Sequence, residues 1–318
     1  MKAILNITVA SKRCCAPFLC RRARCAFFSP LLRRDDSSLA CPERQITVEL
    51  QTNEVVPGAS VAIVTLNRAK AANSMGKEML HQLKQGFDFL ETELSSARDD
   101  TLKHSLRCLI ITSSSPKVFS AGADLKERAI MTIEEAELFV NDLRMTFDRL
   151  AKFSIPSIAA IEGVAVGGGL ELAMAADLRV ASETSLMGLP ETSLAIVPGA
   201  GGTQRLPRLI GMARAKELIW TAQRINGMRA LEYGLVQHVT ESGKALNTAL
   251  DIAWKIARNG PIAIDAAKFA IEKGLQVNDV SHALDVERQA YARVLTSMDR
   301  LEGLAAFKEG RAPVYKGQ

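Results

Sequence analysis

The sequence predicts an α/β fold that continues into a helical C-terminal region. Short apolar runs rich in β-branched residues, typical of buried strands, alternate with longer segments in which apolar residues recur at helical spacing. Beyond residue 246 this alternation stops and only helical segments follow. The predicted strands are residues 46–50, 61–66, 108–113, 157–164 and 235–239, and the predicted C-terminal helices lie around residue 254 and at 261–271, 283–294 and 301–308.

The first 40 residues have the composition of a disordered organellar transit peptide. Residues 1–34 contain eight lysines and arginines and no acidic residue, and the arginines keep every apolar run well short of a membrane span. Residues 1–40 carry a formal charge of +6, from eight basic and two acidic side chains, so the total of +5 leaves −1 for the rest of the chain. The near-neutral remainder argues against nucleic acid or an anionic membrane as a partner. Composition leaves mitochondrion and plastid open, and a basic tail that stays on the protein is the alternative interpretation.

Only one cysteine lies in the part of the chain that is predicted to fold. Five of the six cysteines occur in residues 1–41, and Cys108 stands in the apolar run CLIIT. A single thiol cannot close an intramolecular disulfide, so a reducing compartment fits. We expect Cys108 to be a small core residue and not a nucleophile.

The predicted core opens with two strands, residues 46–50 and 61–66, on either side of a Pro-Gly turn. Residues 75–94 carry one apolar face at helical spacing. After the strand at 108–113, a second long helix is expected at residues 132–153, because its Thr-Ile-Glu-Glu start fits a capping box.

A strand, a glycine turn and a helix are predicted in succession after residue 156. The apolar run 157–164 leads to Gly167, Gly168 and Gly169, and residues of high helix propensity follow. Glycines let the main chain take unusual conformations and let a ligand approach it closely. The free amides of the new helix would point at that ligand, which suits an anion or a developing oxyanion. The small residues at 119–124 predict a second such turn.

Two carboxylates lie in apolar company beside the glycine turn. Glu171 falls in the first turn of the predicted helix, and Glu191 follows Pro190. Burial raises the pKa of a carboxyl group, and two nearby carboxyl groups push their titrations apart, so one can act as acid and the other as base. The alternative is that Glu171 only complements the helix dipole and Glu191 is a solvated loop residue.

Several other chemistries lack their sequence patterns. The glycine-rich segment 199–204 has glutamine in place of the third glycine of a dinucleotide fingerprint, and residues 163–169 end in glycine where a P-loop needs lysine. The four histidines show no metal-ligand spacing, and no serine stands in a nucleophile elbow. We therefore expect no NAD, ATP or metal site and no covalent serine.

Three motifs resemble the enoyl-CoA hydratase/isomerase (crotonase) superfamily. They are AGADLKE at residues 121–127, IEGVAVGGGLELAMAADLRVA at 161–181 and GLPETSLAIVPGAGGTQRL at 188–206. The pieces LNRAKAANSM, FSAGADLKERA and DRLEGLAAFKEGRAPVYKG look most like its mitochondrial AU-binding protein/methylglutaconyl-CoA hydratase branch. The resemblance implies a crotonase-like ββα superhelix at residues 45–245. It also implies a helical region at 246–318 that covers the acyl pocket and mediates trimer contacts.

The resemblance also implies an activity. The expected reaction is syn addition of water to an enoyl-CoA thioester, giving 3-hydroxyacyl-CoA in fatty-acid or branched-chain amino-acid breakdown. Glu171 would help activate the water, Glu191 would deliver the proton to Cα, and the amides of Ala123 and Gly168 would form the oxyanion hole. The residues expected to bind coenzyme A are Ala121, Asp124, Leu125 and Gly167. The implied partners are an acyl-CoA substrate and further copies of the chain, as a homotrimer or a dimer of trimers in the mitochondrial matrix, with no cofactor beyond the coenzyme A of the substrate.

Some alternatives stay open within this family. Leu189 and Leu170 replace residues common in other hydratases, which bears on acyl preference. Methylglutaconyl-CoA hydratase, an enoyl-CoA isomerase and a hydrolase are the alternatives, although two retained glutamates favour a hydratase. RNA binding is disfavoured, because residues 75–107 hold five basic and six acidic side chains and phosphate contacts need a net basic face.

Overall fold

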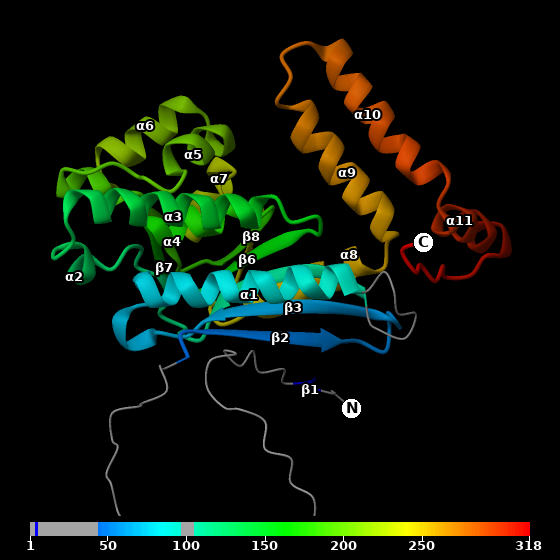
Figure 1. Cartoon of the computed structure of the whole chain (residues 1–318), viewed down its shortest axis with the longest axis horizontal. Coiled ribbons are helices and arrows are strands. Elements are labelled where there is room, and N and C mark those ends of the chain that lie inside the picture. The colour runs from blue at the N-terminus through cyan, green and yellow to red at the C-terminus, as the bar shows by residue number, and fades with distance from the viewer. Residues whose placement is uncertain (1–3, 6–43, 97–104) are drawn as a thin grey trace, which may run out of the picture.

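The computed structural model describes residues 4–5, 44–96 and 105–318 (Figure 1). Apart from Ile4–Leu5, which forms strand β1, the predicted transit peptide lies outside the described residues. The remaining strands are β2 (Ile46–Thr52), β3 (Ala59–Leu66), β4 (Ser105–Ser113), β5 (Val118–Ser120), β6 (Ser157–Ile161), β7 (Val164–Val166), β8 (Leu178–Ser182), β9 (Leu186–Gly188), β10 (Ile225–Asn226) and β11 (His238–Thr240). The α-helices are α1 (Lys77–Ser96), α2 (Leu125–Arg128), α3 (Ile133–Ala151), α4 (Gly168–Ala175), α5 (Gly202–Ile210), α6 (Met212–Trp220), α7 (Gly227–Tyr233), α8 (Ala245–Ala257), α9 (Pro261–Gly274), α10 (Val280–Leu295) and α11 (Met298–Glu309), with 3-10 turns η1 (Ala69–Ala71) and η2 (Pro190–Leu194).

The strands form two sheets that the chain visits in turn. The larger has the order β1-β2-β3-β4-β6-β8-β11 and is parallel from β3 onward, and the smaller has the order β10-β9-β7-β5. The chain adds one strand to each sheet and then a helix, as β4-β5-α3, β6-β7-α4 and β8-β9-α5. Each repeat advances both sheets by one strand. This is the ββα superhelix that the resemblance to the crotonase superfamily implies.

The single strand predicted at residues 157–164 is wrong. β6 ends at Ile161 in the larger sheet, and β7 begins at Val164 in the smaller one. Gly163 makes the turn with a φ of +65°, and a Cβ there would collide with the carbonyl of Lys117. The apolar run is continuous in sequence, but glycine lets the backbone change direction where a larger residue would not fit.

The core occupies both faces of the larger sheet. On one face α1, α3 and α4 enclose the main cluster, in which Phe87 and Phe153 meet edge to face with ring centroids 5.4 Å apart. On the other face α8 lies against the sheet and packs its alanines on Val61, Cys108 and Ile110. Alanine at every fourth position of α8 lets the helix approach the strands closely. Cys108 is a buried core residue, as predicted.

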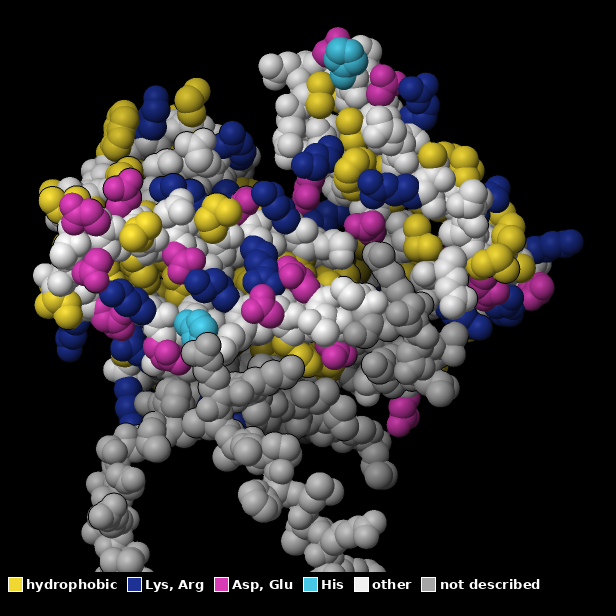
Figure 2. Space-filling model, viewed as in Figure 1, with side chains coloured by type: hydrophobic (Ala, Val, Ile, Leu, Met, Phe, Trp, Pro, Cys, Tyr) yellow, Lys and Arg dark blue, Asp and Glu magenta, His cyan; other side chains and the backbone are white. Residues whose placement is uncertain are grey.

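Two of the C-terminal helices project away from this body. Figure 1 shows α9 and α10 as a hairpin beyond the sheets, with α11 at its base. Hydrophobic side chains are scattered over these helices among charged ones in Figure 2, and Leu275 and Phe307 are 84% and 88% exposed.

The capping box of α3 is formed as predicted, between Thr132 and Glu135. Among the described helices, none combines the length and the apolar character needed to cross a membrane.

Candidate active site

Two backbone turns meet at the start of α4. Gly167, with φ of +54°, precedes the helix, so the amide of Gly168 is a first-turn amide without an intrahelical acceptor. Opposite it, Met75 and Ala123 form a bridge that uses the carbonyl of Gly122 and the amide of Asp124. The amide of Ala123 is therefore outside that ladder. A Cβ on Gly168 would lie 3.5 Å from the Ala123 nitrogen, so the two predicted oxyanion-hole residues are neighbours.

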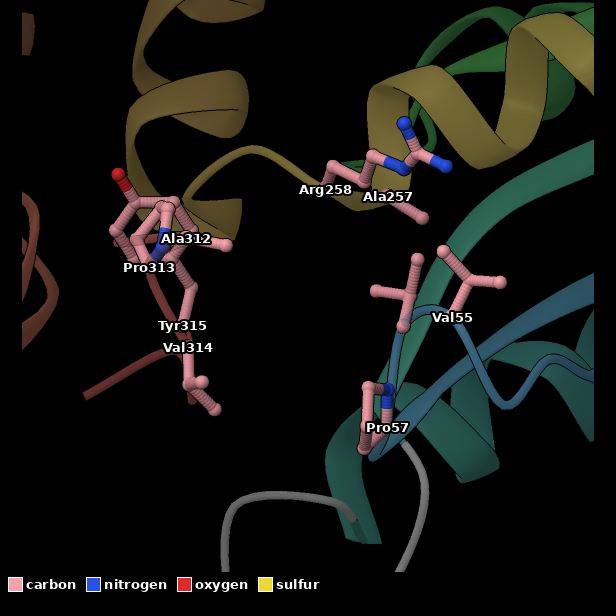
Figure 3. A pocket seen from close by; sticks show the side chains of 9 residues that line it. Val55, Pro57, Ala257, Arg258, Ala312, Pro313, Val314 and Tyr315 are labelled. Carbon is pink, nitrogen blue, oxygen red and sulfur yellow. The ribbon is translucent and has the colours of Figure 1, made fainter. Parts of the chain in front are cut away.

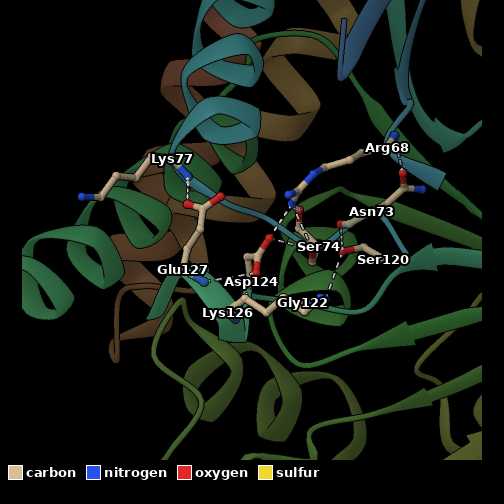
Figure 4. Close-up of polar contacts among 9 residues, drawn as sticks. All are labelled: Arg68, Asn73, Ser74, Lys77, Ser120, Gly122, Asp124, Lys126 and Glu127. Carbon is tan, nitrogen blue, oxygen red and sulfur yellow. Dashed lines mark hydrogen bonds and ion pairs between the residues drawn. The ribbon is translucent and has the colours of Figure 1, made fainter. Parts of the chain in front are cut away.

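A polar network holds the turn that carries Ala123 (Figure 4). Arg68 donates to the Asp124 carboxylate at 2.6 Å, and this carboxylate also accepts from the first amides of α2. The buried Asn73 donates to the carbonyl of Phe119 at 2.9 Å, while its own carbonyl accepts from the Ser120 hydroxyl. Burial alone would raise the pKa of Asp124, but the ion pair and the helix-cap hydrogen bonds together outweigh it and lower that pKa. These side-chain hydrogen bonds hold the turn that carries Ala123 in place without a ligand.

Glu171 is a buried carboxylate with assigned partners. Its side chain is directed at the turn before α5, where Oε1 accepts from the amides of Ala200 at 2.8 Å and Gly202 at 2.7 Å. Burial raises its pKa, and the two amides together with the charges of Arg205 and Arg144 oppose that rise. These partners favour the ionised form, which is the form a base requires.

Glu191 has no comparable set of donors. It lies in η2, and its Oε2 is buried without a hydrogen-bond partner. Burial, with a smaller contribution from the negative charge of Glu171, raises the pKa of Glu191 to about 7. A carboxyl group in these surroundings favours its protonated form, which is the form an acid requires.

A cavity of about 90 Å³ joins these groups. Among its lining residues are seven of the eight predicted site residues: Ala121, Ala123, Leu125, Gly167, Gly168, Glu171 and Glu191. Asp124 does not line it; its side chain is 9% exposed and is engaged by Arg68 and the start of α2. The structure therefore brings both carboxylates and both amides to one cavity and gives Asp124 a supporting position.

The sequence prediction missed three contributors to this site. The amides of Ala200 and Gly202 were not connected with Glu171, and Arg128 was not placed at all. Arg128 is the one basic side chain among the described residues that line the cavity. It stands three residues after Leu125 on α2, so helical spacing from a predicted ligand contact could have found it.

A second, larger cavity lies elsewhere. Its volume is about 350 Å³, and it runs between the turn after β2, the end of α8 and the C-terminal segment around Tyr315 (Figure 3). Arg258 is the only charged residue in its described lining. It contains no paired acid and base, so the smaller cavity is the candidate active site. The described residues contain no cluster of metal-ligating side chains.

A superhelix of ββα turns, with two glutamates and two converging amides at one cavity, defines a crotonase-type enzyme. The chain belongs to the enoyl-CoA hydratase/isomerase family, whose sequence profile matches residues 57–318.

Individual relatives agree with this family. Rat mitochondrial methylglutaconyl-CoA hydratase is 43% identical over 290 residues, which are 90% of this chain and 88% of the relative. Human mitochondrial enoyl-CoA hydratase domain-containing protein 2 is 42% identical over 266 residues, 82% of this chain and 87% of the relative. The crystal structure of an enoyl-CoA hydratase from Bacillus anthracis matches with a TM-score of 0.77 and 46% identity, over 86% of this chain and 100% of that one.

Proposed function

We propose that this enzyme adds water syn across the α,β double bond of an enoyl-CoA thioester to give 3-hydroxyacyl-CoA. The observation that carries the proposal is the contrast between the two carboxylates. Burial raises the pKa of both groups, but at Glu171 two amide donors and two arginine charges oppose that rise, whereas Glu191 has an unpartnered buried oxygen and a pKa raised to about 7. One base and one acid beside two free amides are the groups that hydration needs.

In this scheme the amides of Ala123 and Gly168 bind the thioester oxygen and draw electron density from Cβ. Glu171 takes a proton from water as the new C–O bond forms at Cβ, and the π electrons move onto the thioester oxygen as an enolate. The enolate then collapses as Glu191 gives its proton to Cα. A proton passing back from Glu171 to Glu191 restores the starting state. Coenzyme A enters only as part of the substrate, and the scheme uses no further cofactor.

The test is the loss of enoyl-thioester absorbance when leader-free protein is given crotonyl-CoA. Glu171→Gln and Glu191→Gln should each lower kcat by about 10²–10⁴-fold, because each removes an acid–base group and leaves similar volume. Glu183→Gln, at an exposed position outside the cavity, is the matched control and should keep wild-type activity. Full activity in either active-site variant would contradict the two-carboxylate scheme.

A specific observation favours methylglutaconyl-CoA as a second candidate substrate. Its acyl group bears a carboxylate, and Arg128 supplies a cation to the cavity that holds Glu171 and Glu191. Arg128→Met should then raise KM for 3-methylglutaconyl-CoA by about 10–100-fold and change KM for crotonyl-CoA little. An equal effect on both substrates would remove the argument for a carboxylated acyl group.

Location and assembly are further parts of the proposal. The Arg-rich leader and the mitochondrial relatives support a mitochondrial protein, and we place it in the matrix. The exposed apolar side chains of α9–α11 support a homotrimer or a dimer of trimers. Import into isolated mitochondria with loss of the leader, and light scattering of the leader-free protein, test these two statements separately.

A further inference from the structure

We infer that Arg144 and Arg205 are positioning residues, which hold the turn at residues 199–202 so that two of its amides fix one oxygen of Glu171. Neither arginine lines the cavity of the candidate site. Both reach the turn from its other side, Arg144 from α3 and Arg205 from α5. Their effect on the reaction would pass through the main chain to Glu171.

The argument starts from the planarity of the peptide unit. In a trans peptide the carbonyl of one residue and the N–H of the next point in opposite directions from a rigid plane. Arg144 Nε donates to the carbonyl of Gly199 at 3.0 Å, and the N–H of that same peptide unit, on Ala200, donates to Glu171 Oε1 at 2.8 Å. Fixing the carbonyl therefore aims the amide.

The third peptide unit of the turn is held in the same way. The carbonyl of Gly201 accepts from the backbone amides of Gln204 and Arg205 as α5 begins, and its partner N–H, on Gly202, donates to Glu171 Oε1 at 2.7 Å. Between the two, the Arg205 guanidinium donates to the carbonyl of Ala200 at 3.2 Å. Three consecutive carbonyls are thus bound on one side of the turn, and two amides face Glu171 on the other.

Glycine suits the turn where it passes Arg205 and Glu171. Gly201 has φ of +111°, and a Cβ on it would overlap the Arg205 guanidinium. A Cβ on Gly202 would stand 2.9 Å from Glu171 Oε1. The turn is therefore shaped so that an arginine and a carboxylate can approach its two sides closely.

Charge adds to this geometry. Arg205 and Arg144 both lower the pKa of Glu171, against the burial that raises it. Two other ionisable groups share the cavity with Glu171: Glu191 in η2, whose own pKa is raised by it, and Arg128 of α2. Asp148 of α3 lies 3.6 Å from Arg205. Because Oε1 takes both amides, Oε2 is the oxygen left for a reacting water. The arginines orient the carboxylate and favour its ionised form.

The test compares Arg144→Gln, Arg205→Gln and Arg205→Lys with Arg208→Gln, which changes an exposed arginine one turn along α5. Each of the first two should lower kcat for crotonyl-CoA hydration by about 10–100-fold with KM changed less than about twofold. The acid limb of the pH profile should move to higher pH in both, because a positive charge near Glu171 is lost. Arg205→Lys should restore the position of that limb, and Arg208→Gln should match wild type.

Hydrogen exchange supplies a readout that needs no activity. The amides of residues 200 and 202 should exchange faster in Arg144→Gln and Arg205→Gln than in wild type at equal thermal stability, and unchanged exchange would overturn the inference. The kinetic part rests on the proposed function. If wild type hydrates crotonyl-CoA while both Gln variants keep its kcat and acid limb, the positioning role is wrong and the hydratase proposal stands. If wild type consumes no enoyl-CoA, the hydratase proposal fails, and exchange at residues 200 and 202 still decides the positioning role.

Discussion

Raising the pH through 7 should switch hydration off, because the proposed scheme needs the proton on Glu191. The pKa of that group is raised to about 7 by burial and by Glu171. With that value the protonated fraction is about 0.9 at pH 6, about 0.5 at pH 7 and about 0.1 at pH 8. Activity is therefore present below the pKa and lost above it. The value of kcat/KM at pH 8 should be about one-fifth of that at pH 7 and should then fall about tenfold per pH unit.

The assay is the initial loss of enoyl-thioester absorbance from crotonyl-CoA between about pH 5.5 and 9, with circular dichroism to show that the protein stays folded. The reverse reaction provides an internal check. Dehydration needs the same single proton on the pair, placed on Glu171, so kcat/KM for 3-hydroxybutyryl-CoA must fall along the same limb. A flat or rising profile between pH 7 and 9 in both directions would refute Glu191 as the proton donor.

The structure predicts the outcome of four further changes. The pKa of Glu191 is higher in the folded state, so the free energy of unfolding falls as the pH rises from 4.5 to about 7 and the group ionises. In a thermal melt Glu191→Gln should therefore unfold about 2–4 °C above wild type at pH 8 but not at pH 4. Gly122→Ala should lower kcat about 10²-fold or more in a folded protein, because its Cβ would lie 2.9 Å from the Gly168 nitrogen at φ of +87°. Iodoacetamide should leave native activity unchanged, since burial raises the pKa of the Cys108 thiol to about 12, and should label Cys108 only after denaturation. Phe87→Ala should lower the free energy of unfolding by about 3–5 kcal/mol in a denaturant titration, because the ring is fully buried.

Most of the strands and helices could be predicted, because the spacing of apolar residues along a short segment indicates its secondary structure. The strands β2, β3 and β4 and the helices α1 and α3 match the predicted segments to within a few residues. The break between β6 and β7 was missed for a physical reason. Both strands are apolar, and what separates them is the contact between Gly163 and the carbonyl of Lys117, more than forty residues away. The spacing of apolar residues within one segment cannot reveal a contact between residues so far apart in the sequence.

The candidate site likewise has a part that one segment of the sequence predicts and a part that depends on contacts between distant segments. The glycine turn and the helix that carry Gly168 and Glu171 are encoded within one short segment, so their order could be predicted. Arg128 reaches the cavity only through the tertiary fold, since residues of α3 and α4 line the same cavity. The amides that bind Glu171 come from about thirty residues further along the chain. Contacts of this kind become visible only when the superhelix brings its repeats together.

The proposed scheme gives two chemically identical side chains opposite roles, and the difference lies in their partners. Glu171 stands at the N-terminal ends of two helices, its own α4 and α5, whose amides and dipoles favour an anion. Glu191 stands in a short 3-10 turn, with one oxygen buried against groups that donate nothing to it. Because both residues are glutamate, each proposed role must come from the position in the fold and not from the side chain itself. A carboxylate at 171 would still be held as a base, and one at 191 would still keep its proton near neutral pH.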